Sequence, residues 1–425
     1  MILHPLYKRT AFLLASTLLT SALATQAFAV ELRVAWWGGD ARQVQTNAAL
    51  TLISESKLSD VTYVGESQGR AQYLERLATQ LAGGNAPDLI QTASPDLPQF
   101  HQLLLDLTPY IESGALDISG IDRAMLDAQG TIDGKIVGIP FSIQAFAVLA
   151  NKTAFDKYGI EVPASWDWAE YGKLAQAISD ASGGALKGSA DESSIQSVYE
   201  GWYQTRTGKT LWTAEGARND TVEDLEAWFT YWGDLRASGA IVSADVQASR
   251  IQGDNTTSIL VTGKGALETF VSSGTGSYQA LMTDLVAPLP LPDDGNPANS
   301  ITAGTMFSVP ASTQHADIAV ATLNLMLNDP EAAAILGMTR GSPGTAAARE
   351  AVAATLADGD PLKAVVQFDS LVAAGATGAI RPSPPSYADE NNLFARIGQE
   401  VAFGQRTAAD GAKAFFDQLP GVVNR

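Results

Sequence analysis

The chain has 425 residues, of which 46% are hydrophobic and 17% are charged, with 38 glycines, 19 prolines and no cysteine. This composition is that of a globular protein, and at roughly 100 to 200 residues per domain the length indicates two or three cooperative units. The formal charge of −19 would repel a phosphate backbone or an anionic bilayer, so we expect no nucleic-acid partner. The lack of cysteine excludes disulfides, thiol nucleophiles and thiolate metal sites.

Residues 1–29 have the three parts of a secretory signal peptide. Lys8 and Arg9 give a positive start, residues 11–24 are apolar, and an Ala-Phe-Ala sequence ends at Ala29. Cleavage after Ala29 removes two cations and takes the formal charge from −19 to −21. We expect a soluble exported protein that, without a cysteine for lipid attachment, is free in the periplasm of a bacterial source.

The opening hundred residues alternate strand and helix patterns. We predict strands at 32–37, 61–64 and 88–91, helices beginning near Asp40 and covering 73–81, a tight turn at Gly38-Gly39 and a loop at 65–69. Strands that alternate with helices imply parallel βαβ packing. The sequence therefore predicts an α/β fold.

The rest of the chain contains three proline-rich extended segments between helices. We expect a strand at 134–140 broken by Pro140, a strand at 145–150, extended pieces at 287–297 and 381–387, a helix at 166–181 capped by Ser165, and helices at 222–237, from Asp329, at 391–403 and at 408–418. The segments near Pro140 and at 287–297 are interpreted as places where the chain crosses between lobes.

Few residues with familiar catalytic or metal-binding chemistry remain after processing. His101 and His315 are the two histidines of the mature chain, and no HExxH sequence occurs. The turn at 274–276 lacks the third glycine of a dinucleotide fingerprint, and 207–210 lacks the glycine that a P-loop requires. We therefore expect no metal, no cofactor and no catalytic residue.

The eight tryptophans are the main remaining signal. Sugar rings have flat apolar faces, and tryptophan faces with polar neighbours suit them. Core packing is the interpretation for the helical pair Trp228 and Trp232, and for Trp166 and Trp168 at a helix start.

Trp36, Trp37 and Trp202 are predicted to include the principal stacking surfaces for a solute. Trp36 and Trp37 end a strand, where successive side chains point to opposite sides, so one can pack while the other faces a cleft. Trp202 lies in the sequence GWYQTRTG, which we interpret as a loop with polar neighbours.

Four segments carry a family resemblance: WWGGDAR, YLERLATQLAGGNAPDLIQ, GKIVGIPFSIQAFAVLANKTAFDKYGIEVPASWDWAEYGKLAQAI and GWYQTRTGK. Together they resemble the extracellular solute-binding proteins of the sugar-binding class, family 1, the group that includes maltose-binding protein. The resemblance implies a two-lobe periplasmic binding protein fold with hinge crossings and a ligand cleft between the lobes. It implies an N-terminal lobe of residues 30–141 plus about 289–355 and a C-terminal lobe of residues 142–288 plus about 356–425.

The resemblance also implies function, partners and site residues. The protein would be a monomeric ABC-transporter component that binds a sugar or oligosaccharide and delivers it to permease subunits in the inner membrane. The ligand-binding positions carried over are Trp36, Trp37, Asp40, Arg42, Gln68, Arg70, Gln91, Thr92, Gly304 and Thr305 in the first lobe and Gln144, Trp202, Tyr203, Ser272, Ser273 and Tyr387 in the second.

Two departures from the family pattern bear on the solute. The loop at 65–70 and the region near Ser273 lack the aromatic residues that many sugar binders have there, which favours a small or more polar sugar. Arg42 and Arg70 could bind a sugar carboxylate through two parallel hydrogen bonds, or could be solvent-exposed arginines at helix ends.

Two alternatives remain, one from the enzyme class and one a further member of the binding class. A secreted carbohydrate-active enzyme needs a facing pair of carboxylates, whereas the expected cleft contributes only Asp40. A binding protein for a cationic solute such as a polyamine would use the negative charge of the chain.

Overall fold

The computed structural model describes residue 1 and residues 29–163, 165–213, 216–251, 254–296, 301–375, 384 and 386–423. The expected signal peptide and most of the 381–387 segment lie outside these residues. The strands are β1 (Val30–Trp37), β2 (Val61–Gln68), β3 (Leu89–Thr92), β4 (Thr131–Ile132), β5 (Lys135–Ile136), β6 (Ile139–Asn151), β7 (Lys187–Ser189), β8 (Gly265–Val271), β9 (Val286–Leu289), β10 (Ile301–Ser308) and β11 (Ser342–Pro343).

Helices of very different lengths connect these strands. They are α1 (Asp40–Ser56), α2 (Arg70–Ala82), α3 (Leu97–Phe100), α4 (Thr108–Glu112), α5 (Arg123–Gln129), α6 (Lys152–Tyr158), α7 (Trp168–Ala181), α8 (Gln196–Thr207), α9 (Val222–Ser238), α10 (Ala244–Ala248), α11 (Gly274–Gln279), α12 (Ala316–Asn328), α13 (Pro330–Leu336), α14 (Ala346–Thr355), α15 (Pro361–Gly375), α16 (Tyr387–Ala402), α17 (Ala408–Gln418) and α18 (Pro420–Val423), with short 3-10 turns η1 (Ser94–Asp96), η2 (His101–Leu103), η3 (Glu192–Ser194) and η4 (Asn255–Thr257).

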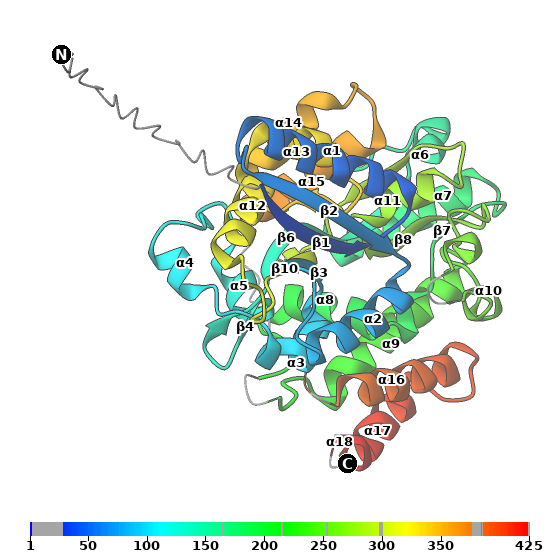
Figure 1. Ribbon diagram of the computed structural model, residues 1–425. Helices are drawn as coiled ribbons and strands as arrows, with labels where there is room; N and C mark the ends of the chain where they lie inside the picture. Colours follow the sequence, from blue (N-terminus) through cyan, green and yellow to red (C-terminus); the bar gives the residue numbers. More distant parts are fainter. Residues whose placement is uncertain are drawn as a thin grey trace.

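The main sheet has the strand order β2-β1-β3-β10-β6-β8-β7. β1 is parallel to both β2 and β3, with α1 and α13 on one side of these strands and α2 and α3 on the other (Figure 1). Leu32, Val34 and Trp36 belong to the core cluster on one face, while Ala35 belongs to the cluster on the other. Burial on both faces is typical of parallel strands, and it confirms the α/β prediction.

Strand β6 joins the two halves of the sheet. It pairs with β10 as far as Ala145, and from Phe146 onward it pairs with β8 and β9. The predicted break at Pro140 is wrong, because this proline lies within the strand. The register of β10 shifts between Thr305 and Met306, opposite Pro140, and such an irregularity is where a sheet accommodates a residue without an N–H.

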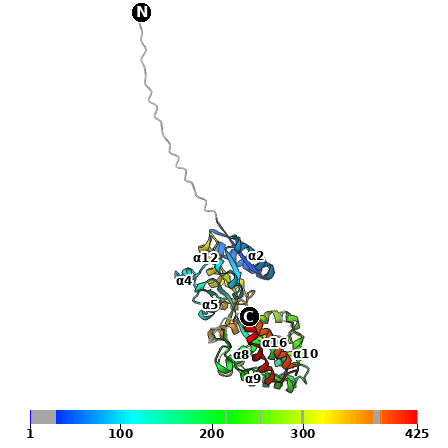
Figure 2. The same cartoon turned by 90° about the horizontal axis from the view of Figure 1, so that it is seen from below.

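The molecule has two lobes (Figure 2). We define the first lobe as the part built on β1, β2, β3, β10 and the first half of β6, with α2, α4, α5 and α12. The second lobe is built on the rest of β6 with β7, β8 and β9, and carries α8, α9, α10 and α16. The two-lobe α/β architecture expected from the resemblance is confirmed.

An aromatic cluster forms the core of the second lobe. It contains six of the eight tryptophans: Trp166, Trp168, Trp202, Trp212, Trp228 and Trp232. The predicted core positions of Trp228 and Trp232 are confirmed, since neither ring has exposed surface.

Two further local predictions need correction. The helix expected from residue 166 with Ser165 as its cap instead begins at Trp168, because Asp167 accepts the Glu170 amide at 2.6 Å and completes a capping box. The expected loop at 65–69 is mostly strand, since β2 runs beside β1 as far as Gln68. The predicted cap Asp329 is confirmed, because its side chain accepts from the amides of Glu331 and Ala332.

Candidate functional site

The carboxyl end of β1 places the two neighbouring tryptophans on opposite faces, as predicted. Trp36 has no exposed surface, and its indole Nε1 has no hydrogen-bond partner among the described residues. It therefore offers no face to a solute, and its predicted stacking role is not supported. Trp37 is half-buried against Tyr73, with 5.5 Å between ring centroids, and the Arg70 guanidinium lies 5.2 Å from its ring centroid.

Arg42 and Arg70 are already occupied by groups of the protein. Arg42 donates from Nη1 to the Trp37 carbonyl at 2.7 Å and from Nε to the Thr339 carbonyl at 3.0 Å, and burial lowers its pKa. Arg70 binds both carboxylate oxygens of Asp96, at 2.9 and 3.1 Å. Both guanidinium groups therefore have partners within the protein in this arrangement, and their binding of a sugar carboxylate stays a prediction.

Gln91 and Thr92 are fully buried at the carboxyl end of β3. Gln91 accepts a 2.8 Å hydrogen bond from Nε of Arg340, whose Nη2 donates to Thr46 at 2.8 Å. Burial, together with the charge of Arg42, lowers the pKa of Arg340 to about 9. Arg340 thus holds Gln91 inside the first lobe, away from a solute.

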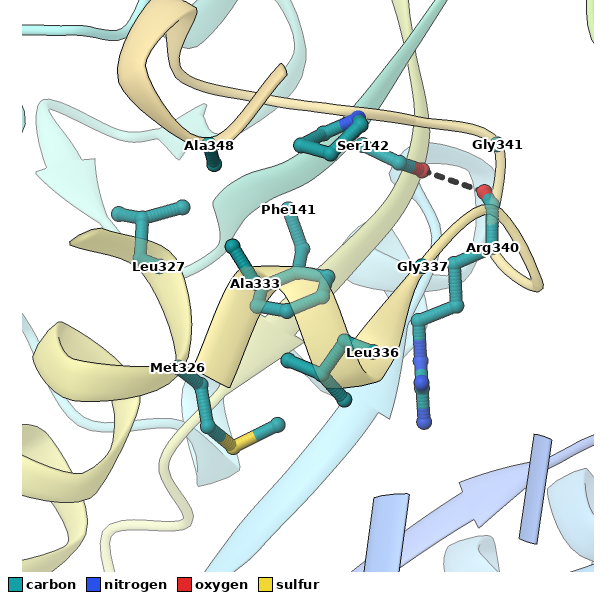
Figure 3. Close-up of a pocket in the computed structure, with 11 residues that line it drawn as sticks. Phe141, Ser142, Met326, Leu327, Ala333, Leu336, Gly337, Arg340, Gly341 and Ala348 are labelled. Carbon is teal, nitrogen blue, oxygen red and sulfur yellow. Dashed lines mark hydrogen bonds between the residues drawn. The ribbon is translucent and has the colours of Figure 1, made fainter. Parts of the chain in front are cut away.

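A small cavity of about 20 Å³ lies beside the start of β6. Phe141, Ala333 and Leu336 form its apolar walls, and the Ser142 hydroxyl donates to the Arg340 carbonyl at 2.7 Å (Figure 3). The Arg340 guanidinium lies 5.9 Å from the centroid of the Phe141 ring, which is one of these walls. The volume is enough for about one water molecule and excludes a sugar ring.

Several predicted residues do meet where β6 passes between the lobes. The Ser273 hydroxyl donates to Oε1 of Gln144 at 2.8 Å, and the Ala145 amide donates to the Ser272 hydroxyl at 3.0 Å. Ser272 is fully buried, whereas Gln144 and Ser273 are half-buried. The predicted grouping of these three residues is therefore present, with Ser272 fixing the backbone rather than facing outward.

Gly304 and Thr305 lie on the opposite side of β6. The Thr305 hydroxyl is 2.9 Å from that of Ser142, and a Cβ on Gly304 would stand only 2.8 Å from the Ser142 hydroxyl. Thr305 is buried. These residues allow β10 to approach β6 closely at the crossing.

Two first-lobe positions remain at the surface of the strand ends. Gln68 is half-buried and paired with Trp37, and its carbonyl accepts the Gly38 amide at 3.0 Å. Asp40 is exposed at the first residue of α1.

Trp202 and Tyr203 lie on helix α8, so the loop predicted for this segment is wrong. Trp202 is 3% exposed and packs among core aromatic rings, with the Arg206 guanidinium 4.5 Å from its ring centroid. Tyr203 is buried and donates to the Asn219 carbonyl at 2.9 Å. A helix whose aromatic residues are turned inward gives a solute no stacking surface here.

The second lobe contains a cavity of about 460 Å³ at the carboxyl ends of β7 and β8, which we call the second-lobe cavity. Ligands of α/β sheets bind at this end of the strands, and the volume lies within the roughly 300–1,000 Å³ of small-molecule sites. Its lining includes Phe146, Asp191, Glu192, Ser193, Ser194, Ser197, Gln247, Arg250, Asp254, Asn255, Phe270, Tyr278, Tyr387, Asn391, Gln399 and Phe403.

Aromatic rings form several walls of the second-lobe cavity. Phe270 and Tyr278 stack with 5.4 Å between centroids and 18° between planes. Phe146 follows the crossing directly, and Tyr387 begins α16. Tyr387 is thus the one predicted site residue found in this lining, and rings of this kind can stack on sugar faces.

The polar wall of the cavity is formed by the turn after β7. The Ser193 amide donates to Asp191 at 3.1 Å, Arg236 contacts Asp191 at 2.7 Å, and Trp228 donates to the Ser193 carbonyl at 2.9 Å. Helix α16 approaches this turn closely through Gly398, where a Cβ would stand 2.7 Å from Cα of Ser194. Contacts from two helices, α9 through Trp228 and Arg236 and α16 through Gly398, therefore fix the position of this turn.

Phe270 and Glu192 are candidate site residues that the sequence reasoning missed. Phe270 directly precedes Val271 and the predicted Ser272, so the strand-end argument used for Trp36 and Trp37 would have found it. Glu192 had no such signal, because the three-residue strand β7 was not recognised.

A larger hollow of about 810 Å³ lies between residues 119–122, α14 and α15. Its described lining contains no aromatic side chain, so it lacks the stacking surface that a sugar site uses. In the described part of the chain, no group of three or more His, Cys, Asp or Glu residues could hold a metal ion, and no helix is long and apolar enough to cross a membrane.

Comparison with known proteins identifies relatives of this fold. The profile of the bacterial extracellular solute-binding protein family matches residues 55–364. An extracellular solute-binding protein family 1 from Alicyclobacillus acidocaldarius is 26% identical, with a TM-score of 0.79 over 93% of this chain and 99% of that chain.

Two other solved structures share the architecture. A periplasmic oligogalacturonide binding protein from Yersinia enterocolitica, in complex with saturated digalacturonic acid, is 24% identical, with a TM-score of 0.69 over 93% of this chain and 99% of that one. A de novo designed cysteine esterase is 24% identical, with a TM-score of 0.76 over 94% and 99%. At these identities the likeness shows the fold alone. With the family profile matching most of its length, the chain belongs to the bacterial extracellular solute-binding proteins.

Proposed function

We propose that the protein is the periplasmic solute-binding component of an ABC importer. It binds a sugar or small oligosaccharide reversibly, carries out no reaction on it, and delivers it as a monomer to permease subunits in the inner membrane. Membership of the solute-binding family supports this role, as does the likeness to a protein that binds an oligogalacturonide.

The second-lobe cavity is the observation that carries the proposal. It combines aromatic rings with hydroxyl, amide and carboxylate groups at the carboxyl ends of β7 and β8. This mixture suits a sugar, whose apolar ring faces need stacking partners and whose hydroxyls need hydrogen-bond partners.

A solute held in this cavity would also contact the first lobe on closure. The exposed or half-buried predicted residues that take part in the proposal are Trp37, Asp40, Arg42, Gln68, Arg70, Gln144, Ser273, Gly304 and Tyr387. The division into lobes near 141/142, 288/289 and 355/356 belongs to the proposal, supported by the change of β6 partners after Ala145.

If the solute contacts both lobes, the two lobes should close around it by a hinge motion. The solute binds the closed arrangement with higher affinity than the open one, so its binding shifts the protein toward the closed arrangement. Small-angle scattering should show a smaller radius of gyration at saturating solute. An unchanged scattering profile with bound solute would contradict closure.

A thermal-shift panel tests the solute class directly, because a ligand that binds only the folded state raises the melting temperature. Maltose, digalacturonate and spermidine represent neutral sugars, acidic sugars and polyamines. We expect sugars to raise the melting temperature and to remain chemically unchanged after hours of incubation. Product formation would instead indicate a carbohydrate-active enzyme.

A cationic solute is the second candidate, because three acids line the second-lobe cavity against one arginine. Asp191, Glu192 and Asp254 face the same hollow as Arg250, and an excess of carboxylates attracts cations. A response to spermidine alone would favour this candidate over a sugar.

A further inference from the structure

Glu192 is a cavity-wall acid whose carboxyl group is buried without an ion pair. Its side chain is 1% exposed, and Oε1 accepts the Thr269 amide at 2.9 Å. Among the described residues, no other hydrogen bond to this carboxyl group occurs. In contrast, Asp191 pairs with Arg236 at 2.7 Å, and Asp254 accepts hydrogen bonds from the turn that it caps.

Arg250 is the cation whose charge stabilises the ionised form of Glu192, but its ion pair is with another acid. Arg250 forms an ion pair with Glu268, a fully buried acid on β8 that also accepts from Ser258 at 2.6 Å and from Tyr278 at 3.0 Å. The charge of one guanidinium therefore acts on two carboxyl groups, of which only Glu268 pairs with it. Glu192 is the one of the two that lines the cavity.

The surroundings of Glu192 set its protonation. Burial raises its pKa to about 7, with a further rise from Glu268 and Asp191, while Arg250 and the Thr269 amide lower it. The Tyr171 hydroxyl on α7 also interacts with it. The carboxyl group can therefore change its charge near neutral pH.

We infer that Glu192 is a specificity-determining residue that accepts a hydrogen bond from a solute hydroxyl and selects a neutral sugar over an acidic one at this wall. The inference rests on the proposed sugar-binding function. A carboxylate acceptor makes stronger hydrogen bonds to hydroxyl donors than a neutral acceptor does. A sugar carboxylate at the same place would meet a like charge and lose affinity.

A proton-linkage effect follows from this contact. A hydroxyl donor favours the ionised form of Glu192, so binding of the solute lowers the pKa of Glu192. Protein molecules in which Glu192 was protonated before binding therefore release that proton. Affinity for a neutral sugar should therefore rise between pH 6 and pH 8, by at most about tenfold per pH unit. A sugar carboxylate placed against Glu192 would give the opposite slope.

Calorimetry on the wild-type protein tests this without any substitution. Titration of maltose, or of the neutral sugar with the largest thermal shift, in two buffers of different ionisation enthalpy at pH 7 gives the number of protons released. We expect release of roughly half a proton, because a group with a pKa near 7 is half protonated at that pH. No release, or proton uptake, would overturn the inference.

Two variants identify the titrating residue. Glu192→Gln keeps an oxygen to accept the Thr269 amide but cannot ionise, so we expect roughly tenfold weaker binding at pH 8 and no pH slope. Glu200→Gln is the comparison for the pH slope, since Glu200 is buried on α8, has a pKa raised to about 7 by burial, and does not itself line the cavity. Glu200 interacts with the Tyr387 side chain, so the affinity of this variant can change while its pH slope should not. The rise of affinity with pH should persist in Glu200→Gln. If this rise were lost in Glu200→Gln and kept in Glu192→Gln, the role of Glu192 would be overturned.

The possible failures can be told apart. If no sugar in the panel binds, the proposed function fails. If a neutral sugar binds with no proton release and Glu192→Gln keeps its affinity and pH slope, the function stands and the inference about Glu192 fails. Melting temperatures of the variants at pH 6 and pH 8 show whether they are folded.

Discussion

The carboxyl ends of the strands are closed in the first lobe and hollow in the second. At the ends of β1 and β3, Trp36 and Gln91 have no exposed surface, and the buried Arg340 joins Gln91 to Thr46 of α1. At the ends of β7 and β8, Phe270 and Glu192 line a cavity of about 460 Å³. The same topological position therefore mainly serves packing in the first lobe, where only residues at its surface such as Trp37 and Gln68 take part in our proposal, and forms a cavity wall in the second.

The difference lies in what covers the strand ends. In the first lobe the Arg42 side chain bridges the Trp37 and Thr339 carbonyls and covers the edge. In the second lobe, residues of α10, α16 and β8 line the cavity, and no side chain fills the space that they enclose. A strand-end residue is thus a site candidate only where no neighbouring side chain fills the space beyond it.

Trp36→Ala should produce the largest effect and test the closed side of the comparison. Truncating a fully buried tryptophan should lower the free energy of unfolding by about 3–5 kcal/mol, measured by urea denaturation without solute. A small stability change combined with lost sugar binding would mean that this ring belongs to the site after all.

The next prediction concerns the pH dependence of stability contributed by Asp369 of α15, which lies in the region between the lobes. It is fully buried and accepts a hydrogen bond from Ser342, and burial raises its pKa from 3.8 to about 6. The folded protein then binds more protons than the unfolded chain between about pH 4 and pH 6, so this group makes stability fall as pH rises through that range.

Comparison with Asp369→Asn isolates this contribution. The stability of the wild type relative to the variant should fall by roughly 2–3 kcal/mol between pH 4 and pH 7, measured by urea unfolding at each pH. A constant difference across that range would show that Asp369 does not titrate with the raised pKa.

Phe270→Ala should weaken sugar binding by about 1–3 kcal/mol, or roughly 5- to 150-fold, because it removes an aromatic wall of the second-lobe cavity. Phe416→Ala is the matched control, since Phe416 is a half-buried ring of the same lobe that packs on Phe415 outside the cavity. Calorimetry should show weakened affinity for the first variant alone. Equal affinities would place the sugar elsewhere.

Arg70→Ala should have the smallest effect. The Arg70 side chain is 49% exposed in its pair with Asp96, so its removal should change stability by less than about 1 kcal/mol. Affinities for maltose and digalacturonate should change by the same small factor. A loss of affinity for digalacturonate alone would support the predicted role of Arg70 in binding a sugar carboxylate.

The sequence was informative about elements with strong local signals. The bounds of α17 agree with the predicted 408–418, and the turn chemistry of Asp329 gave the correct cap. The prediction of a crossing near Pro140 rested on a break in the strand that does not occur. Pro140 lies within β6, opposite a register shift of β10. The pairing register of two strands whose partners Ser142 and Thr305 are 163 residues apart leaves no local pattern in the sequence.

The candidate site was less predictable because exposure depends on packing between distant segments. The aromatic sequence around Trp202 reads equally well as a loop or as a helix whose rings face inward, and only the neighbouring Trp228 and Phe394 decide between them. Glu192 lines a cavity because α10 and α16 come from other parts of the chain. No pattern near Glu192 contains that information.

The late position of β10 in the sequence has a consequence for biosynthesis. β10 lies between β3 and β6 in the sheet, yet its residues follow all those of β7, β8 and β9. At about 5–20 residues per second, roughly 8 to 30 seconds of synthesis separate the end of β6 from the start of β10. During that time β3 and β6 have unpaired edges, which are templates for aggregation. We therefore expect the nascent chain to depend on chaperones or rapid export until residue 308 has emerged.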